Sequence, residues 1–505
     1  MPKIIKSDWF LIFILLIIFL SILPFFYMHQ GTFSVDIGRE LYISQRVFHG
    51  DVLYKDIFNV YGPFSYQFNA ILMKLFSQKI YTIYNFGLIN SFAIITALYF
   101  IARHFLNKSL SFLISVMSLF SLVYTVTLFN SNLTYSIGLS YALSSFLISL
   151  LFLLKYIKEE HIKYVYIASF FAGISILSKY EFFLYTFVLL YVLLFLKPIG
   201  IKNFFKAFIC FISVPVISLS ILFVQGLTFG ELIDALKCMY KVTCSKSVHL
   251  MYARYGTIFM QRFYFRLVEK QGILAIIGFL PIINILLSVI FFKSIKQDKL
   301  LLVFCLAVIC SAFKYTLYLN IAYMGVFVFP LCLMLTMVLA DKIGNFNKLK
   351  YMILLTLIAL SSYVDFDMLK LKNNLFETSK GNFYMYNWDR MIMKTVIDYA
   401  NENIPQDKKL VVLPEGAFAN YISDRKGDSL YHNLVPMYYT DTFGEEQVLK
   451  HFDEYPADYF ALIPLSTIEY GSPRFCMYAR HFCEMIEQNY TLEKDENNVR
   501  IYKRK

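Results

Sequence analysis

The carboxylates best suited to chemistry lie in or just after residues 35–50: Asp36, Glu40 one helical turn later, and Asp56. A carboxylate can take the proton of a hydroxyl group while the hydroxyl oxygen attacks an electrophilic carbon. Asp36, Glu40 and Asp56 are therefore the candidates for a catalytic base in this segment. Each has a structural alternative, because an Asp at a helix start is often an N-cap and the other two acids could be solvated surface groups.

A second set of candidates is cationic. Seven cations lie within residues 226–270, namely Lys237, Lys241, Lys246, Arg254, Arg262, Arg266 and Lys270. Arg binds phosphate through two parallel hydrogen bonds and Lys meets it as a point charge. We therefore expect Arg254, Arg262 and Arg266 to hold a phosphate, with adhesion of the loop to anionic lipid as the alternative.

Three more charges lie at the ends of apolar runs, where ionisable groups are costly and are usually functional or paired. Lys179 and Glu181 share a tight turn, and Lys314 closes an apolar run. All three are predicted to bind substrate. The alternatives are an ion pair between Lys179 and Glu181 and extension of Lys314 towards the headgroups.

The element that positions Asp36 is predicted to be a short amphipathic helix. The apolar side chains on one of its faces are Ile37, Leu41 and Phe48. Arg39, Glu40 and Arg46 lie mostly away from that face, and Gly50 is expected to end the helix. Such a helix is suited to lie along a membrane interface.

The rest of the chain indicates a polytopic α-helical membrane protein. Of its 505 residues, 58% are hydrophobic and only 16% are charged, against about 25% charged in soluble domains. About eleven transmembrane helices are predicted. The apolar runs are 9–28, 81–102, 110–128, 135–154, 164–178, 182–196, 207–224, 273–292, 300–313, 321–340 and 351–363. We read the first run as a retained span, because it is too long for a signal peptide and lacks a small-residue cleavage site.

The charges between the runs predict the orientation. Loops carrying Lys and Arg alternate with short, almost uncharged loops, which is the positive-inside pattern with a cytoplasmic N-terminus. Three segments then face outward: 30–79, 226–270 and the tail from 364 to 505. The net charge of +12 lies between apolar runs, beside anionic headgroups, so no nucleic-acid partner is expected.

The tail is much more polar and alternates strand-like with helical patterns. Residues 410–413, 459–463 and 499–502 are predicted strands, and 391–401 and 445–452 are predicted helices. We therefore divide the chain into a transmembrane core, 1–363, and an extracytoplasmic α/β domain, 364–505. Two cysteine pairs in the segments predicted to face outward, Cys238/Cys244 and Cys476/Cys483, could form disulfides or remain free thiols.

The first outer segment resembles a known family. An acid directly after the first run, a surface helix that ends in Gly, and the strings LYKDI (53–57) and YGP (61–63) resemble the GT-C superfamily of membrane glycosyltransferases. The likeness is to bacterial family-39-like enzymes, relatives of protein O-mannosyltransferases and aminoarabinose transferases. In such enzymes a carboxylate in this loop acts as general base or organises the site, which implies one of these roles for Asp36 and leaves a divalent metal open.

This chain departs from the family pattern at one position, and the resemblance implies further site residues. Many relatives have two adjacent acids here, whereas this chain has Asp36-Ile37, so Glu40 is the candidate for the second acid. Arg39 and Tyr61 in the same loop are candidates for substrate binding. Turns similar to Lys179-Tyr180-Glu181 occur in relatives.

The implied function is transfer of a hexose or pentose from a polyprenyl-phosphate donor to a lipid, glycan or protein acceptor on the outer face of the cell membrane. A polysaccharide polymerase or ligase would use the same donors and is the first alternative. A transporter or flippase for lipid-linked sugars is disfavoured, because nearly all charges lie at the ends of the runs rather than at mid-membrane. The last alternative is a non-catalytic assembly protein.

Overall fold

The computed structural model describes residues 7–126, 130–251, 272–318 and 326–505. It divides into two compact units. Unit 1 comprises 1–31, 84–219 and 258–371, and unit 2 comprises 32–83, 220–257 and 372–505. The tail's unit begins at Lys372 rather than at the predicted boundary after residue 363, because the last apolar helix continues to Leu371. Most of both predicted outer loops belongs to unit 2, together with the tail.

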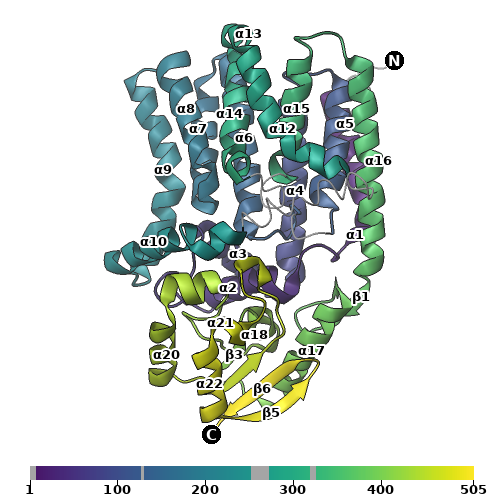
Figure 1. Ribbon diagram of the computed structural model, residues 1–505. Helices are drawn as coiled ribbons and strands as arrows, with labels where there is room; N and C mark the ends of the chain where they lie inside the picture. Colours follow the sequence, from purple (N-terminus) through teal and green to yellow (C-terminus); the bar gives the residue numbers. More distant parts are fainter. Residues whose placement is uncertain (1–6, 127–129, 252–271, 319–325) are drawn as a thin grey trace. The chain divides into compact units, whose positions relative to one another are not determined.

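The described part of unit 1 consists of helices and their connections, without a β-strand (Figure 1). Its α-helices are α1 (Asp8–Phe26), α4 (Ile80–Ala102), α5 (Lys108–Ser118), α6 (Ile137–Glu159), α7 (Ile162–Ser178), α8 (Phe183–Tyr191), α9 (Ile201–Val224), α12 (Gly272–Ile290), α13 (Phe292–Gln297), α14 (Lys299–Tyr318), α15 (Val326–Ala340) and α16 (Asn347–Leu371). The first residues of α4 and the last of α9 fall in unit 2. The shorter turns are η3 (Leu119–Val123), η4 (Tyr180–Phe182) and η5 (Val192–Leu196).

Every predicted apolar run overlaps one of these helices. Within the described residues, five helices are long and apolar enough to cross a membrane: α1, α4, α6, α9 and α16. Six shorter apolar helices account for the other runs. The predicted number of eleven spans stays a prediction, because a full crossing needs about 20 residues.

Small polar residues allow α6 and α7 to pack closely. Ser149 Oγ donates to the carbonyl oxygen of Ala168 at 2.7 Å, and Ser175 Oγ donates to that of Ala142 at 2.9 Å. Each hydroxyl group thus donates its hydrogen bond to a backbone carbonyl of the facing helix, in a region where no water is available as a partner. The most apolar stretch of α6 is 89% buried, so this helix forms the centre of unit 1.

Unit 2 contains a four-stranded mixed sheet in the order β3-β4-β6-β5. Its strands are β3 (Leu410–Leu413), β4 (Tyr459–Leu462), β5 (Tyr490–Glu496) and β6 (Val499–Arg504), with β3 and β4 parallel and the other pairs antiparallel. β1 (Asn374–Phe376) and β2 (Phe383–Met385) form a separate hairpin. The strands predicted at 410–413, 459–463 and 499–502 are confirmed.

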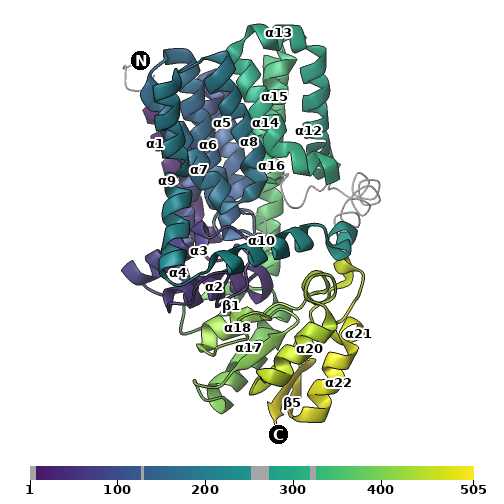
Figure 2. The same cartoon turned by 90° about the vertical axis from the view of Figure 1, so that its left-hand side faces the viewer.

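The helices of unit 2 cover both faces of this sheet (Figures 1 and 2). The tail contributes α17 (Asn387–Asn403), α18 (Ala417–Ser423), α19 (Pro436–Tyr438), η7 (Tyr439–Phe443), α20 (Glu445–Glu454), η8 (Ile468–Tyr470), α21 (Phe475–Tyr478) and α22 (Arg480–Asn489). The two predicted outer loops contribute η2 (Phe33–Ile37), α2 (Gly38–Phe48), α3 (Phe64–Leu75) and α10 (Phe229–Thr243). The helices predicted at 391–401 and 445–452 lie within α17 and α20.

Alternation along the strands explains the core of unit 2. Val411, Leu413 and Phe460 point to one face and pack with Phe452 of α20 and Phe482 of α22. Of the two candidate cysteine pairs, Cys476 and Cys483 form a disulfide between α21 and α22, while Cys238 and Cys244 are free thiols.

Candidate active site

Asp36 lies in a π-helical turn, η2, and does not cap the helix that follows. The N-cap position of α2 is occupied by Ile37, and no side chain accepts a hydrogen bond there. Asp36 Oδ1 instead lies 3.4 Å from Nη2 of Arg39, the second residue of α2. The capping interpretation of Asp36 is therefore wrong, and its carboxylate is turned towards a cation.

Arg39 joins two carboxylates that are far apart in the sequence. Its Nη2 faces Asp36, and its Nη1 donates to Oε1 of Glu415, which follows β3. The side chains of Arg39 and Glu415 are 5% and 6% exposed, whereas Asp36 is 21% exposed. The guanidinium is therefore buried with a partner, and Asp36 is the acid of this group that remains accessible.

Burial raises the pKa of the Asp36 carboxyl above its ordinary value, and the attraction of Arg39 opposes this shift without cancelling it. A carboxylate with a raised pKa holds a transferred proton more firmly than an ordinary surface Asp does. Its environment therefore suits a general base.

The charged face of α2 is buried in the protein, although the sequence predicted an amphipathic helix that lies along a membrane interface. Arg39, Glu40 and Arg46 are 4%, 0% and 6% exposed. The reason is that α18 packs against the start of α2: a Cβ placed on Gly38 would lie 2.3 Å from Cβ of Phe418. Only glycine allows this approach, which brings the tail onto the first loop within unit 2.

Glu40 and Asp56, the other predicted acids, are both bound to their surroundings. Glu40 is fully buried and accepts a hydrogen bond from the Tyr66 hydroxyl of α3 at 2.9 Å. Asp56 Oδ2 accepts from the backbone N–H of Val52 at 2.8 Å, within a turn. These contacts favour structural roles, a link between α2 and α3 for Glu40 and a closed turn for Asp56.

A small pocket lies beside Arg39 inside unit 2. It is lined by Arg39, Ile43, Phe58, Asn59, Val60, Tyr61, His432, Asn433 and Tyr438. The pocket thus brings together the first loop and the tail, and two predicted binding residues, Arg39 and Tyr61, line it. Its free volume is about 10 Å³, which is room for about one water molecule.

The tail contributes polar residues to this pocket that were not predicted from the sequence, among them His432 and Asn433. Burial and the nearby charge of Arg39 lower the pKa of His432 to about 4, so its imidazole is neutral at neutral pH. Asn433 is 2% exposed; its Oδ1 accepts from the N–H of Val435, and among the described residues its Nδ2 has no partner. The only sequence signal was the mostly polar stretch 428–433 within the tail, and this signal is weak.

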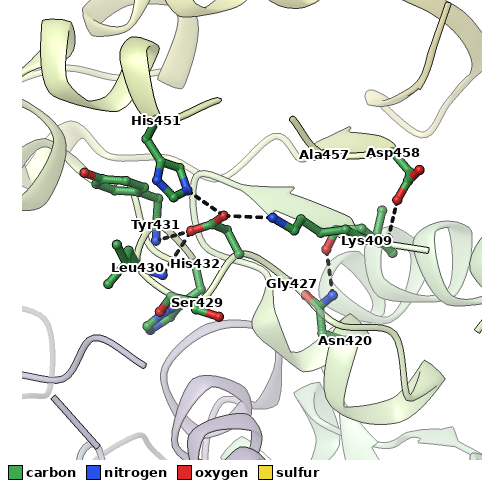
Figure 3. A network of polar contacts seen from close by, with 12 residues as sticks. Lys409, Asn420, Gly427, Ser429, Leu430, Tyr431, His432, His451, Ala457 and Asp458 are labelled. Atoms are coloured by element: carbon green, nitrogen blue, oxygen red, sulfur yellow. Dashed lines mark hydrogen bonds and ion pairs between the residues drawn. The ribbon is translucent and has the colours of Figure 1, made fainter. Parts of the chain in front are cut away.

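The loop carrying His432 is held by Asp428, whose carboxylate accepts from the backbone N–H groups of Leu430 and Tyr431 at 2.9 and 2.8 Å. His451 Nε2 lies 2.9 Å from Asp428 Oδ2, and Lys409 approaches from the other side at 3.4 Å (Figure 3). Burial acts to raise the pKa of Asp428, but these partners together hold it at about 2. The pocket loop therefore rests on a buried, ionised carboxylate.

The remaining predicted binding residues lie outside this site. Lys179 and Glu181 form a buried ion pair of 3.8 Å within unit 1, which favours the paired alternative. Lys314 belongs to α14, but its side chain is outside the described part of the structure, as are Arg254, Arg262 and Arg266 altogether. The predicted phosphate-binding role of these four cations stays a prediction.

The Asp36 site does not fit a metal ion in this arrangement. The place between the carboxylates of Asp36 and Glu415 is taken by the guanidinium of Arg39, which supplies the positive charge there. Elsewhere, the described residues contain no cluster of three or more His, Cys, Asp or Glu side chains able to hold a metal.

Comparison with known proteins places the fold. The family model for dolichyl-phosphate-mannose-protein mannosyltransferases matches residues 61–224. ArnT from Cupriavidus metallidurans, solved with undecaprenyl phosphate, is 12% identical, and the superposition covers 96% of this chain and 97% of ArnT with a TM-score of 0.58. No curated protein matches the sequence.

Two structures of the oligosaccharyltransferase from Archaeoglobus fulgidus are also similar. The complex with Zn and sulfate is 12% identical, with 89% of this chain and 67% of that chain covered and a TM-score of 0.51. The complex of AglB with an inhibitory peptide and a dolichol-phosphate is 12% identical, with 90% and 69% covered and a TM-score of 0.50. The predicted resemblance to GT-C membrane glycosyltransferases is therefore confirmed, as a helical membrane fold with a small sheet-containing unit.

Proposed function

We propose that this chain transfers a sugar from a polyprenyl-phosphate donor to an acceptor hydroxyl at the outer face of the membrane, with Asp36 as the general base. The fold and the family match support the reaction class. ArnT was solved with undecaprenyl phosphate and AglB with a dolichol-phosphate, which supports a lipid-linked donor here. The proposed orientation has the N-terminus in the cytoplasm and unit 2 outside, following the charge pattern of the loops.

The proposed reaction is a single displacement at the anomeric carbon. The acceptor oxygen forms a bond to this carbon while the bond from the carbon to the phosphate oxygen breaks, which releases polyprenyl phosphate. The hydroxyl proton passes to Asp36. Attack from the face opposite the phosphate inverts the anomeric centre.

One observation carries the assignment of Asp36: its carboxylate does not cap α2, and it faces Arg39 while a fifth of its side chain stays accessible. An Asp with a capping role would accept a hydrogen bond from a backbone N–H at the start of the helix. Arg39 is held in place by Glu415 and fixes the orientation of Asp36. Arg39 also lines the pocket. The raised pKa of Asp36 gives the carboxylate the basicity that the proton transfer needs.

The direct test is release of polyprenyl phosphate by the full-length protein in lipid nanodiscs. A panel of polyprenyl-phosphate sugars is incubated with cell-envelope extract, and mass spectrometry follows both polyprenyl phosphate and glycosylated acceptor. Loss of a general base costs about 10²- to 10⁴-fold in rate, so we expect this loss in Asp36→Asn at an unchanged protein level. Asp234→Asn, at an exposed surface carboxylate, is the matched control and should keep full activity.

The pH dependence sharpens the test. Because Asp36 must be deprotonated to act, the rate should rise with pH through a midpoint above 3.8, the ordinary pKa of Asp. Transport without formation of a glycosidic bond would favour the flippase alternative. Full activity of Asp36→Asn would contradict the role of this residue, even if glycosyl transfer itself were observed.

A further inference from the structure

The helix α10, in the second outer loop, has an apolar face that no described part of the protein covers. Phe229, Ile233, Leu236 and Tyr240 are 70%, 37%, 53% and 71% exposed. Their spacing of four, three and four residues places them within an arc of about 60° on a helix that turns about 100° per residue. The exposure is therefore one continuous stripe along the helix.

The other faces of α10 have different characters. Asp234, Lys237 and Lys241 lie on the flank beside the apolar stripe, and Lys237 pairs with Asp234 at 2.8 Å. The third face, which includes Val242, is half-buried or buried. A helix that packs on one face, and exposes separate charged and apolar faces, has the composition of one lying at a water–lipid boundary.

Both ends of α10 are fixed within unit 2. Thr228 and Glu231 form a capping box that defines the start of the helix. Just before it, Lys55 Nζ donates to the carbonyl oxygen of Gly226 at 3.0 Å; just after the helix, the N–H of Ser247 donates to Asp441 at 2.7 Å. The apolar stripe is therefore presented by a helix held at its two ends.

Chain connectivity identifies what can cover this stripe. The preceding helix α9 is long and apolar enough to cross a membrane and ends at Val224, four residues before Thr228. Four residues span at most about 14 Å, so the start of α10 cannot lie far from the end of a membrane-spanning helix. Tyr240, at the end of the stripe, is a residue type enriched at headgroup level.

We propose that α10 lies in the plane of the bilayer interface, with Phe229, Ile233, Leu236 and Tyr240 among the upper acyl chains and with Lys237 and Lys241 at the phosphate groups. This surface docks unit 2 onto the lipid through a contact separate from the spanning helices. Because the far end of α10 is tied to Asp441 in η7, next to the pocket residue Tyr438, docking sets the height of the pocket above the membrane.

Tryptophan fluorescence in nanodiscs tests this placement. The chain has two native tryptophans, Trp9 and Trp388, which are replaced by Phe in a full-length background. Into it we place Leu236→Trp on the apolar stripe or, as a matched control two positions away, Asp234→Trp on the charged flank. Phosphatidylcholine brominated near the top of its acyl chains quenches a tryptophan among the acyl chains, and aqueous iodide quenches one in water.

We expect brominated lipid to quench Leu236→Trp at least about twofold more than Asp234→Trp, and iodide to show the reverse order. Ile233→Trp, on the same stripe, should repeat the Leu236→Trp result and replaces it if that variant does not elute as a single species. Equal quenching of the stripe and flank variants overturns the proposal. So does a Leu236→Trp probe that neither quencher reaches, because the stripe would then be covered by protein, such as a second copy of this chain.

Discussion

The guanidinium of Arg39 pairs with the carboxylate of Glu415, which comes 376 positions later in the chain. This pair joins the start of α2 to the turn after β3, and it leaves the other side of the guanidinium facing Asp36. An acid from the first predicted outer loop is thus oriented by Arg39, whose own position depends on the tail. The predictions below test this dependence and the network that supports it.

The first prediction concerns Glu415. Glu415→Gln removes one partner of a buried charge, so we expect the free energy of unfolding to fall by about 3 kcal/mol. Arg39 would then attract Asp36 without competition, which lowers the pKa of Asp36 and moves the acidic limb of the rate profile to lower pH. Chemical denaturation and a pH–rate profile of the same preparation measure both effects. An unshifted limb would show that Glu415 does not influence Asp36.

A second prediction separates Glu40 from Asp36. Because Glu40 is fully buried and bonded to Tyr66, Glu40→Gln should keep the activity per folded molecule within about tenfold. Tyr66→Phe removes this donor from a buried carboxylate and should destabilise the protein by about 2 kcal/mol. A loss of activity in Glu40→Gln as large as that in Asp36→Asn, at equal stability, would make Glu40 the second acid of the site.

The third prediction concerns the support of the pocket loop. The pKa of Asp428 is held at about 2, against an ordinary 3.8, so its ionised form stabilises the fold above pH 4, and this contribution is lost as the pH falls towards 2. This shift corresponds to about 2 kcal/mol. Asp428→Asn should lose that amount at pH 7, measured by thermal unfolding in detergent. The exposed Asp398→Asn is the control and should change stability little.

The fourth prediction follows from the neutral imidazole of His432. Its pKa is lowered from 6.5 to about 4, so the unfolded chain takes up a proton below pH 6.5 that the folded protein does not accept until about pH 4. Stability should therefore fall by about 3 kcal/mol as the pH drops through this window. His432→Gln should flatten this slope. A slope that is unchanged in the variant would place the responsible group elsewhere.

Local patterns predicted much of this architecture. The predicted spans and the strands at 410–413 and 459–463 follow from unbroken apolar runs, and the helix after Asp36 follows from the helical spacing of its apolar residues. Both signals depend only on neighbours along the chain. Gly50 and the apolar spacing were sufficient to place α2 to within a few residues. The likeness of the first loop to GT-C enzymes was also local, because it lay in adjacent residues.

The sequence determined that the chain is a helical membrane protein with an α/β tail, and it singled out Asp36. Only the tertiary structure decided that Asp36 faces Arg39 instead of capping α2, that the charged face of α2 is buried, and that Glu415, His432 and Asn433 lie beside it. The physical reason is that burial and ion pairing depend on which distant segment packs on a helix. For α2 this segment is α18, which can approach so closely only because Gly38 has no side chain.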